Sequence, residues 1–134
     1  MTEKILFVDS THPSLPQRLS HAGCECIDGS AMSRREALAA IEDCTGIIIR
    51  SRMPVDREML LRGKNLRFIA RAGAGMENID TGHAAQLGIS CFNAPEGNRD
   101  AVAEHALGML LCLMNNIASA DREVRAGLRR REGR

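Results

Sequence analysis

The chain has 134 residues, of which 44% are hydrophobic and 26% charged, so its composition is that of an ordinary globular domain and not of a disordered chain. Its formal net charge of +1 gives no general reason to expect a nucleic acid or an anionic membrane as a partner. No apolar run reaches the roughly 18 residues of a membrane-spanning helix, and the first residues lack the apolar stretch of a secretion signal. We therefore expect a cytoplasmic protein.

Five short apolar runs, each closed by a polar or glycine-containing turn, predict buried parallel strands. In chain order they are residues 4–9, 24–28, 46–50, 66–73 and 89–95, of which the second is the weakest. Helical patterns alternate with them at residues 15–22, 33–44, 56–63 and 80–87. Ser33 and Glu36 have the spacing of a capping box, and Gly88 ends the last of these helices.

Strands that alternate with helices through right-handed crossovers predict a doubly wound α/β domain. We expect a flavodoxin-like, five-stranded parallel sheet that occupies residues 1–98.

A long helix is predicted at residues 100–117, where apolar residues surround most of the helix. Such a helix must be buried on most of its sides, which one small sheet cannot provide. The pattern therefore implies contact with another domain or subunit. We expect residues 99–134 to be this crossing helix and the beginning of a second domain, and the chain to be a fragment of a longer protein.

The five cysteines have no paired C-x-x-C spacing, and four of them lie within or beside apolar segments. We predict buried small hydrophobes instead of zinc ligands or disulfide partners. The sequence also contains no recognisable nucleophile with a base and no set of residues with metal-ligand spacing. No catalytic residue and no metal are therefore predicted.

Ligands of open α/β sheets bind beyond the carboxyl ends of the strands, so the residues that follow each strand are the candidate site. Arg50, Ser51 and Arg52 follow the third predicted strand, and Arg71 begins a glycine-containing loop that follows the fourth. Arginines beside a loop rich in backbone N–H groups are typical of an anion site.

The Gly73-Ala74-Gly75 loop does not match the dinucleotide fingerprint, because Asn78 stands where a third small residue is required and the loop follows the fourth strand instead of the first. Two interpretations remain open from the residues alone. The loop could hold a carboxylate, or it could be a tight turn without a ligand.

Two other functions of flavodoxin-like folds fit poorly. A phosphoacceptor receiver domain needs an aspartate at the end of the third strand, where this chain has Arg50. A flavin carrier needs aromatic faces, and the sequence contains no Trp and no Tyr.

Three segments together resemble the D-isomer-specific 2-hydroxyacid dehydrogenases: "IIIRSR", "RAGAGMENID" and "FNAPEGNRDAVAEHALGMLL". The similarity extends through essentially the whole chain and is strongest to members that act on a phosphorylated substrate. It implies a substrate-binding domain, followed by a long helix that crosses into an NAD-binding domain. The implied cofactor is NAD, the implied ligand is a small 2-hydroxy or 2-oxo acid with or without a phosphate, and the implied assembly is a homodimer.

By position, the resemblance implies roles for individual residues. The backbone of Ala72, Gly73, Ala74 and Gly75 would anchor the substrate, Arg50 and Arg71 would offer charge to a phosphate, and Ser51 and Arg52 would assist. Asn98 would lie near the substrate and the nicotinamide. Ala74 departs from the hydroxyl-bearing residue that some members carry, which removes one phosphate contact.

The family's cofactor fingerprint, its catalytic arginine and its acid–base pair would lie beyond Arg134, so we expect the chain to have no turnover by itself. Two alternatives stay open. One is a glyoxylate or hydroxypyruvate reductase, which needs only the carboxylate anchor. The other is a non-catalytic module that binds a small anion and dimerises through its apolar helix.

Overall fold

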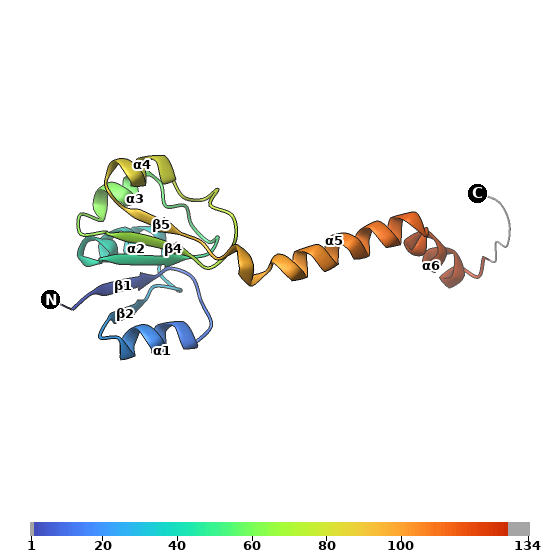
Figure 1. Cartoon of the computed structure of the whole chain (residues 1–134), viewed down its shortest axis with the longest axis horizontal. Helices are drawn as coiled ribbons and strands as arrows, with labels where there is room; N and C mark the ends of the chain where they lie inside the picture. The colour runs from blue at the N-terminus through green and yellow to red at the C-terminus, as the bar shows by residue number, and fades with distance from the viewer. Residues whose placement is uncertain (1, 129–134) are drawn as a thin grey trace. The chain divides into compact units, whose positions relative to one another are not determined.

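Five parallel strands form one sheet in the computed structural model, which describes residues 2–128 (Figure 1). The strands are β1 (Lys4–Phe7), β2 (Glu25–Asp28), β3 (Gly46–Ile49), β4 (Phe68–Arg71) and β5 (Ser90–Phe92). Their order in the sheet is β2-β1-β3-β4-β5. This is the flavodoxin-like order, and it confirms the predicted fold.

Each strand is shorter than its apolar run, because a strand ends where its neighbour stops pairing with it. Ile49 and Arg71 are the last pair of β3 and β4, so the residues after Arg71 already belong to a loop. The chain divides into two compact units, residues 1–97 and 98–134, and the whole sheet belongs to the first.

Four helices connect the strands of the first unit. They are α1 (Ser14–His21), α2 (Arg34–Ala40), α3 (Arg57–Arg62) and α4 (Thr81–Gln86), and the short 3-10 turns η1 (Ile41–Asp43) and η2 (Pro95–Gly97) follow α2 and β5. Ser33 and Glu36 form the predicted capping box, and Asp56 and Asp80 cap α3 and α4. The predicted helix at 33–44 tightens into η1 after Ala40, as helix ends commonly do.

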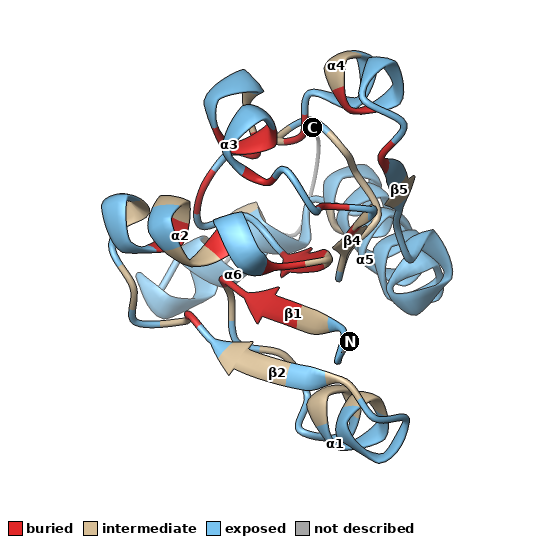
Figure 2. Cartoon of the chain, turned by 90° about the vertical axis from the view of Figure 1, so that its left-hand side faces the viewer, coloured by how far each residue is buried: buried red, intermediate tan, exposed pale blue. Residues whose placement is uncertain are grey.

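Helices cover the two faces of the sheet unequally. Leu6, Ile47 and Ile69 point into the larger core, which also takes side chains from α2, α3 and α4. Ile5, Phe7 and Ile48 point the other way, where Leu15 and Leu19 of α1 pack against them. Figure 2 shows α1 on one side of the sheet and α3 and α4 on the other. Because successive side chains of a strand point to opposite faces of the sheet, the same strands contribute residues to both cores.

Gly46 is a glycine because of its neighbour on β4. It pairs with Phe68, and a Cβ atom at position 46 would overlap the Phe68 ring. The ring packs over the bare backbone of β3 and helps to close the smaller core.

The second unit contains α5 (Arg99–Met114) and α6 (Ile117–Arg125). The predicted single helix at 100–117 therefore ends earlier than expected. Asn116 takes a left-handed conformation with φ 53°, which asparagine tolerates better than most residues, and this interrupts the helix. No residue of α5 or α6 is buried.

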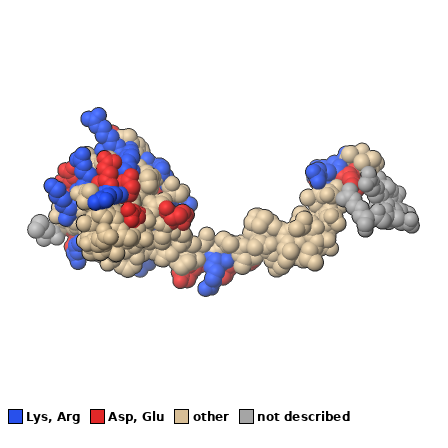
Figure 3. All heavy atoms as spheres, turned by 90° about the horizontal axis from the view of Figure 1, so that it is seen from above, with Lys and Arg blue, Asp and Glu red and all other residues tan. Residues whose placement is uncertain are grey.

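Charge is distributed differently over the two units. Figure 3 shows side chains of both signs on the first unit and a long uncharged stretch in the second. No Lys, Arg, Asp or Glu occurs between Glu104 and Asp121. No single described helix is long and apolar enough to cross a membrane, and α5 and α6 meet that test only when counted together, across a bend of 61°.

The cysteines follow the prediction only in part. Cys44 is buried in the larger core, where burial raises the pKa of its thiol. The other four are half-buried. They are therefore less enclosed than we expected from the apolar residues around them in the sequence. All five are free thiols.

Candidate functional site at the ends of β3 and β4

The loops that follow β3 and β4 are joined at the carboxyl edge of the sheet. The carbonyl oxygen of Arg50 accepts hydrogen bonds from Arg71 Nε and from Asn78 Nδ2, each at 3.0 Å. Asn78 Nδ2 also donates to the Met53 carbonyl at 3.4 Å. The strand ends therefore converge, as the arrangement of parallel neighbours predicts.

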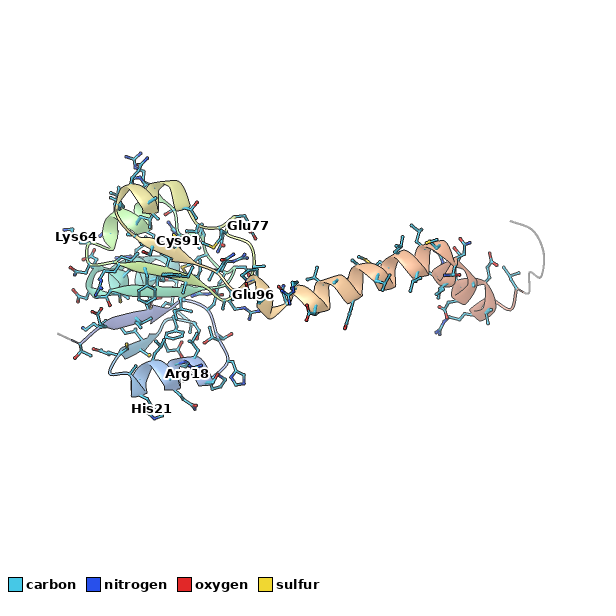
Figure 4. The ribbon with its side chains drawn as sticks, in the orientation of Figure 1. Arg18, His21, Lys64, Glu77, Cys91 and Glu96 are labelled. Atoms are coloured by element: carbon cyan, nitrogen blue, oxygen red, sulfur yellow. The ribbon has the colours of Figure 1, made fainter. Side chains whose placement is uncertain are left out.

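Arg71 is engaged inside the protein. Its side chain is only 12% exposed, and its guanidinium pairs with Glu77 at 3.2 Å. The same group donates to the carbonyls of Arg50 and Gly75. In Figure 4, Glu77 lies on this loop at the carboxyl edge, and Lys64 lies at the opposite edge of the sheet. Arg71, predicted to offer charge to a ligand, holds the loop in this structure.

Arg52 is engaged in a similar way. Its guanidinium donates to the carbonyls of Val8 and Met32, each at 2.7 Å, and of Gly29 at 2.8 Å. It thereby connects the end of β1 to the loop that follows β2. Its contacts are those of a structural residue, and a contact with substrate stays a prediction.

Arg50 and Ser51 are the predicted polar residues whose side chains remain available. Both are exposed, and neither side chain has a hydrogen-bond partner among the residues that the structure describes. The Arg50 backbone is well held, because its N–H donates to Asp9 Oδ2 at 2.6 Å. A fixed backbone with an uncommitted guanidinium suits an anion contact.

The four predicted anchoring residues differ in what their backbones can offer. The Ala72 N–H donates to Ile49 O at 2.8 Å, and the Gly73 N–H donates to Arg71 O at 2.9 Å. The N–H groups of Ala74 and Gly75 have no acceptor among residues 2–128. Of the four predicted anchoring residues, Ala74 and Gly75 are therefore the two whose backbone N–H groups remain available to a ligand.

Met76 extends this set. Its N–H also has no acceptor in the described part of the chain, and the same is true of Glu77 and Asn78, so the run of unpaired amides extends over residues 74–78. The sequence analysis did not include Met76, because it considered the loop only as far as Gly75. The signal that could have identified Met76 is its position in the same turn, directly after Gly75. A run of unpaired backbone N–H groups is an anion-binding arrangement.

The two glycines of the loop have different reasons to be there. A Cβ atom at position 75 would overlap the Glu77 carboxylate and come within 2.9 Å of Arg71 Nη1, so it would disturb that ion pair. At position 73 the nearest atom would be Arg71 Cζ at 3.7 Å, an ordinary contact. Neither glycine has a positive φ. Close packing, rather than an unusual backbone angle, therefore explains Gly75.

Asn98 belongs to the second unit, where it precedes α5 without a side-chain capping bond. Its proximity to a ligand stays a prediction. The loop is not among the residues that line three hollows of about 520, 310 and 560 Å³ on the first unit.

The chemistry of this surface is binding. Arg50, Ser51 and the amides of Ala74, Gly75 and Met76 can hold and orient a small anion. No cluster of three or more His, Cys, Asp or Glu in the described residues could hold a metal ion.

Comparison with known proteins gives a family. The model of the "D-isomer specific 2-hydroxyacid dehydrogenase, catalytic domain" matches residues 5–130. D-3-phosphoglycerate dehydrogenase of Sus scrofa is 34% identical over 124 residues, which are 92% of this chain and 23% of that protein. The enzyme of the same name from Archaeoglobus fulgidus is 36% identical, with 92% of this chain and 24% of that protein covered. The chain thus spans about a quarter of the length of these relatives.

Solved structures agree with the fold. An NAD⁺-bound 3-phosphoglycerate dehydrogenase from Entamoeba histolytica has a TM-score of 0.70 and 28% identity, and it covers 100% of this chain and 43% of its own. A glyoxylate reductase from Paecilomyes thermophila has a TM-score of 0.81 at 20% identity, covers 94% of this chain and 42% of its own, and supports the fold alone.

Proposed function

Since the chain belongs to the D-isomer-specific 2-hydroxyacid dehydrogenase family, we propose that it is the substrate-binding part of an NAD-dependent member that resembles D-3-phosphoglycerate dehydrogenase. The complete enzyme would oxidise the CH–OH group of a D-2-hydroxy acid by hydride transfer to NAD. This part would bind and position the acid.

The observation that carries the proposal is the run of amides without acceptors that begins with Ala74, Gly75 and Met76. Two oxygens of a carboxylate match consecutive N–H donors, and hydrogen bonds to a charged acceptor are stronger than neutral ones. Every substrate of a 2-hydroxyacid dehydrogenase carries a carboxylate next to the reacting carbon. The amides would therefore fix the end of the substrate that all such acids share.

Arg50 would distinguish among these acids. Its exposed guanidinium follows β3, next to the strand whose loop carries the amides. A planar guanidinium forms paired hydrogen bonds with phosphate oxygens, so it suits the far end of a phosphorylated substrate. Ser51, the next residue, would add a hydroxyl donor.

NAD would be held mainly by residues outside this chain, because the only Gly-x-Gly of the sequence, at 73–75, follows β4 and lacks the third small residue. The relative with bound NAD⁺ is a chain more than twice as long as the part that matches. The acid–base chemistry would also come from that remainder. We further propose a cytoplasmic homodimer that has no nucleic-acid or membrane partner.

The second candidate is a glyoxylate or hydroxypyruvate reductase. It is favoured by the engagement of Arg52 and Arg71 inside the protein, which leaves one predicted arginine available for a phosphate. Such an enzyme would need the amides alone.

Binding of 3-phosphoglycerate and of D-glycerate to this chain separates the two candidates, because these acids differ only in the phosphate. Isothermal titration of the unaltered chain and of Arg50→Ala should show a loss of about tenfold or more for 3-phosphoglycerate and little change for D-glycerate. Arg18→Ala on α1, an exposed arginine visible in Figure 4, is the matched control and should change neither. Equal losses for both acids would contradict the phosphate role of Arg50 and favour the reductase.

A further inference from the structure

Three consecutive carbonyl oxygens of the candidate loop are held by separate donors. Gly73 O accepts from the Ala94 N–H at 2.9 Å. Ala74 O accepts from Asn93 Nδ2 at 2.6 Å. Gly75 O accepts from the Arg71 guanidinium. The loop after β4 is thus secured both by its own strand and by the residues that follow β5.

This arrangement determines where the first three amides of the run point. In a planar trans peptide, the carbonyl of one residue and the N–H of the next point in opposite directions. The described chain contains no cis peptide bond. Holding the oxygens of residues 73, 74 and 75 therefore directs each N–H group of residues 74, 75 and 76 away from the donor that holds the preceding carbonyl, and no described residue accepts these N–H groups.

Of the three donors, Asn93 is the one whose side chain serves this contact alone. Arg71 also binds Arg50 and Glu77, and Ala94 contributes its backbone. Asn93 is exposed, and a single surface hydrogen bond adds only about 0.5–1.5 kcal/mol to stability. Its loss should therefore leave the domain folded, while it removes the one bond to the Ala74 carbonyl among the described residues.

We propose that Asn93 is a positioning residue for the substrate carboxylate, which acts by holding the Ala74 carbonyl so that the Gly75 N–H faces the ligand. The inference rests on the proposed function. The Asn93 amide does not touch the substrate. It acts through the peptide group between Ala74 and Gly75. Because this group is already held in place before the acid binds, less conformational freedom is lost on binding.

Asn93→Leu tests the proposal, because leucine has nearly the same size, carries no charge and donates no hydrogen bond. Asn93→Gln restores a donor on a longer side chain. The matched control is Asn65→Leu, which removes another single bond from a side-chain amide to a carbonyl, that of Glu42 at 3.2 Å, away from the loop. Thermal unfolding followed by circular dichroism would establish that each variant folds.

The first measurement needs no ligand. Relaxation of the ¹⁵N amide signals should show greater picosecond-to-nanosecond mobility at Gly75 in Asn93→Leu, partial recovery in Asn93→Gln, and no change in Asn65→Leu. Unchanged mobility at Gly75 in Asn93→Leu would overturn the proposal.

The second measurement titrates the same samples with D-glycerate and with 3-phosphoglycerate. Asn93→Leu should weaken both acids alike, by about tenfold, because both carry the carboxylate. A loss confined to 3-phosphoglycerate, or a loss of stability without a loss of affinity, would contradict a carboxylate role for Asn93. If the unaltered chain binds neither acid while Gly75 still loosens in Asn93→Leu, the proposed function has failed and the positioning role has failed with it, although the loop is held as described.

Discussion

The two units of the chain treat their apolar residues in opposite ways. In residues 2–97, strands and helices bury large side chains such as Leu6, Ile47 and Ile69 completely. In residues 98–128, no side chain of α5 or α6 is buried. Large apolar side chains of the uncharged stretch are exposed, among them Leu107 at 57% and Leu113 at 77%. The same kinds of residue thus stabilise one unit and leave the other without a core of its own.

The comparison teaches what a fold must contain in order to stand alone. The first unit has a sheet with helices on both faces, so its apolar surface is removed from water. The second unit has only two helices among its described residues, which cannot enclose the many apolar side chains of α5. Exposed apolar surface of that kind indicates a contact surface.

The largest expected effect is on assembly. We predict that this chain self-associates through α5, and that Leu107→Glu combined with Leu111→Glu, one helical turn apart, shifts it to monomer. Each leucine buried in such a contact contributes about 1.5–3 kcal/mol. Leu61→Glu on α3, an equally exposed leucine of the first unit, should leave the assembly unchanged. Light scattering and sedimentation velocity would measure the mass, and an unaltered chain that stays monomeric at high concentration would refute the prediction.

The next effect is on folding stability, and it uses one substitution in both units. Leu6→Ala should lower the free energy of unfolding by about 2–5 kcal/mol, because Leu6 is 0% exposed and its removal leaves a cavity. Leu113→Ala, at a site that is 77% exposed, should change it by less than about 0.5 kcal/mol in dilute solution. Urea unfolding followed by circular dichroism is suitable, since the chain has no Trp or Tyr for fluorescence. Equal losses of unfolding free energy in Leu6→Ala and Leu113→Ala would contradict the difference in burial between the two units.

The smallest effect is a dependence on pH in the first unit. Burial acts to raise the pKa of Asp56, but hydrogen bonds from Arg34 and from the Met59 N–H outweigh it, and the pKa is lowered. A carboxyl whose pKa is lower in the folded state stabilises that state above its unfolded pKa, near about 4, and the stabilisation is lost as the pH falls through the folded pKa.

Asp56→Ala should therefore cost about 0.5–2 kcal/mol at neutral pH, the usual value for an N-cap, and the cost should shrink as the pH falls below about 4. Asp121→Ala, which breaks an exposed pair with Arg125 in α6, should cost less than about 1 kcal/mol at neutral pH. Urea midpoints measured from pH 7 to pH 3 would test both. A difference between Asp56→Ala and the unaltered chain that stays constant with pH would contradict the assignment.

Much of the first unit could be predicted from local patterns. The apolar runs of β1, β3 and β4, the capping box at Ser33 and the cap at Asp80 depend on residues close in sequence, so their signals survive without tertiary information. The end of α5 was less predictable, because the apolar pattern continues to Ile117 and the left-handed conformation of Asn116 interrupts it.

The features of the candidate site can be divided in the same way, into those that the local sequence predicts and those that only tertiary contacts reveal. The sequence placed Arg50, Arg52 and Arg71 at strand ends, but it could not distinguish among three arginines that look alike as letters. Tertiary contacts did so: Arg52 reaches the carbonyls of Val8 and Gly29, and Arg71 reaches its own loop, which leaves Arg50 available. Met76 and Asn93, to which we assign roles by proposal, were not found in the sequence because the argument for them rests on hydrogen bonds that are made or left unmade in the fold.

By itself, the sequence determined the order of strands and helices, the parallel sheet and the family, because periodicity, caps and motif spacing are properties of neighbouring residues, and it predicted the edge at which a ligand would bind. Only the tertiary structure decided which guanidinium and which amides remain available at that edge. The reason is physical: a hydrogen-bonding group is available only when no other part of the folded chain has already paired with it, and those partners lie up to 44 residues away, as for Arg52 and Val8.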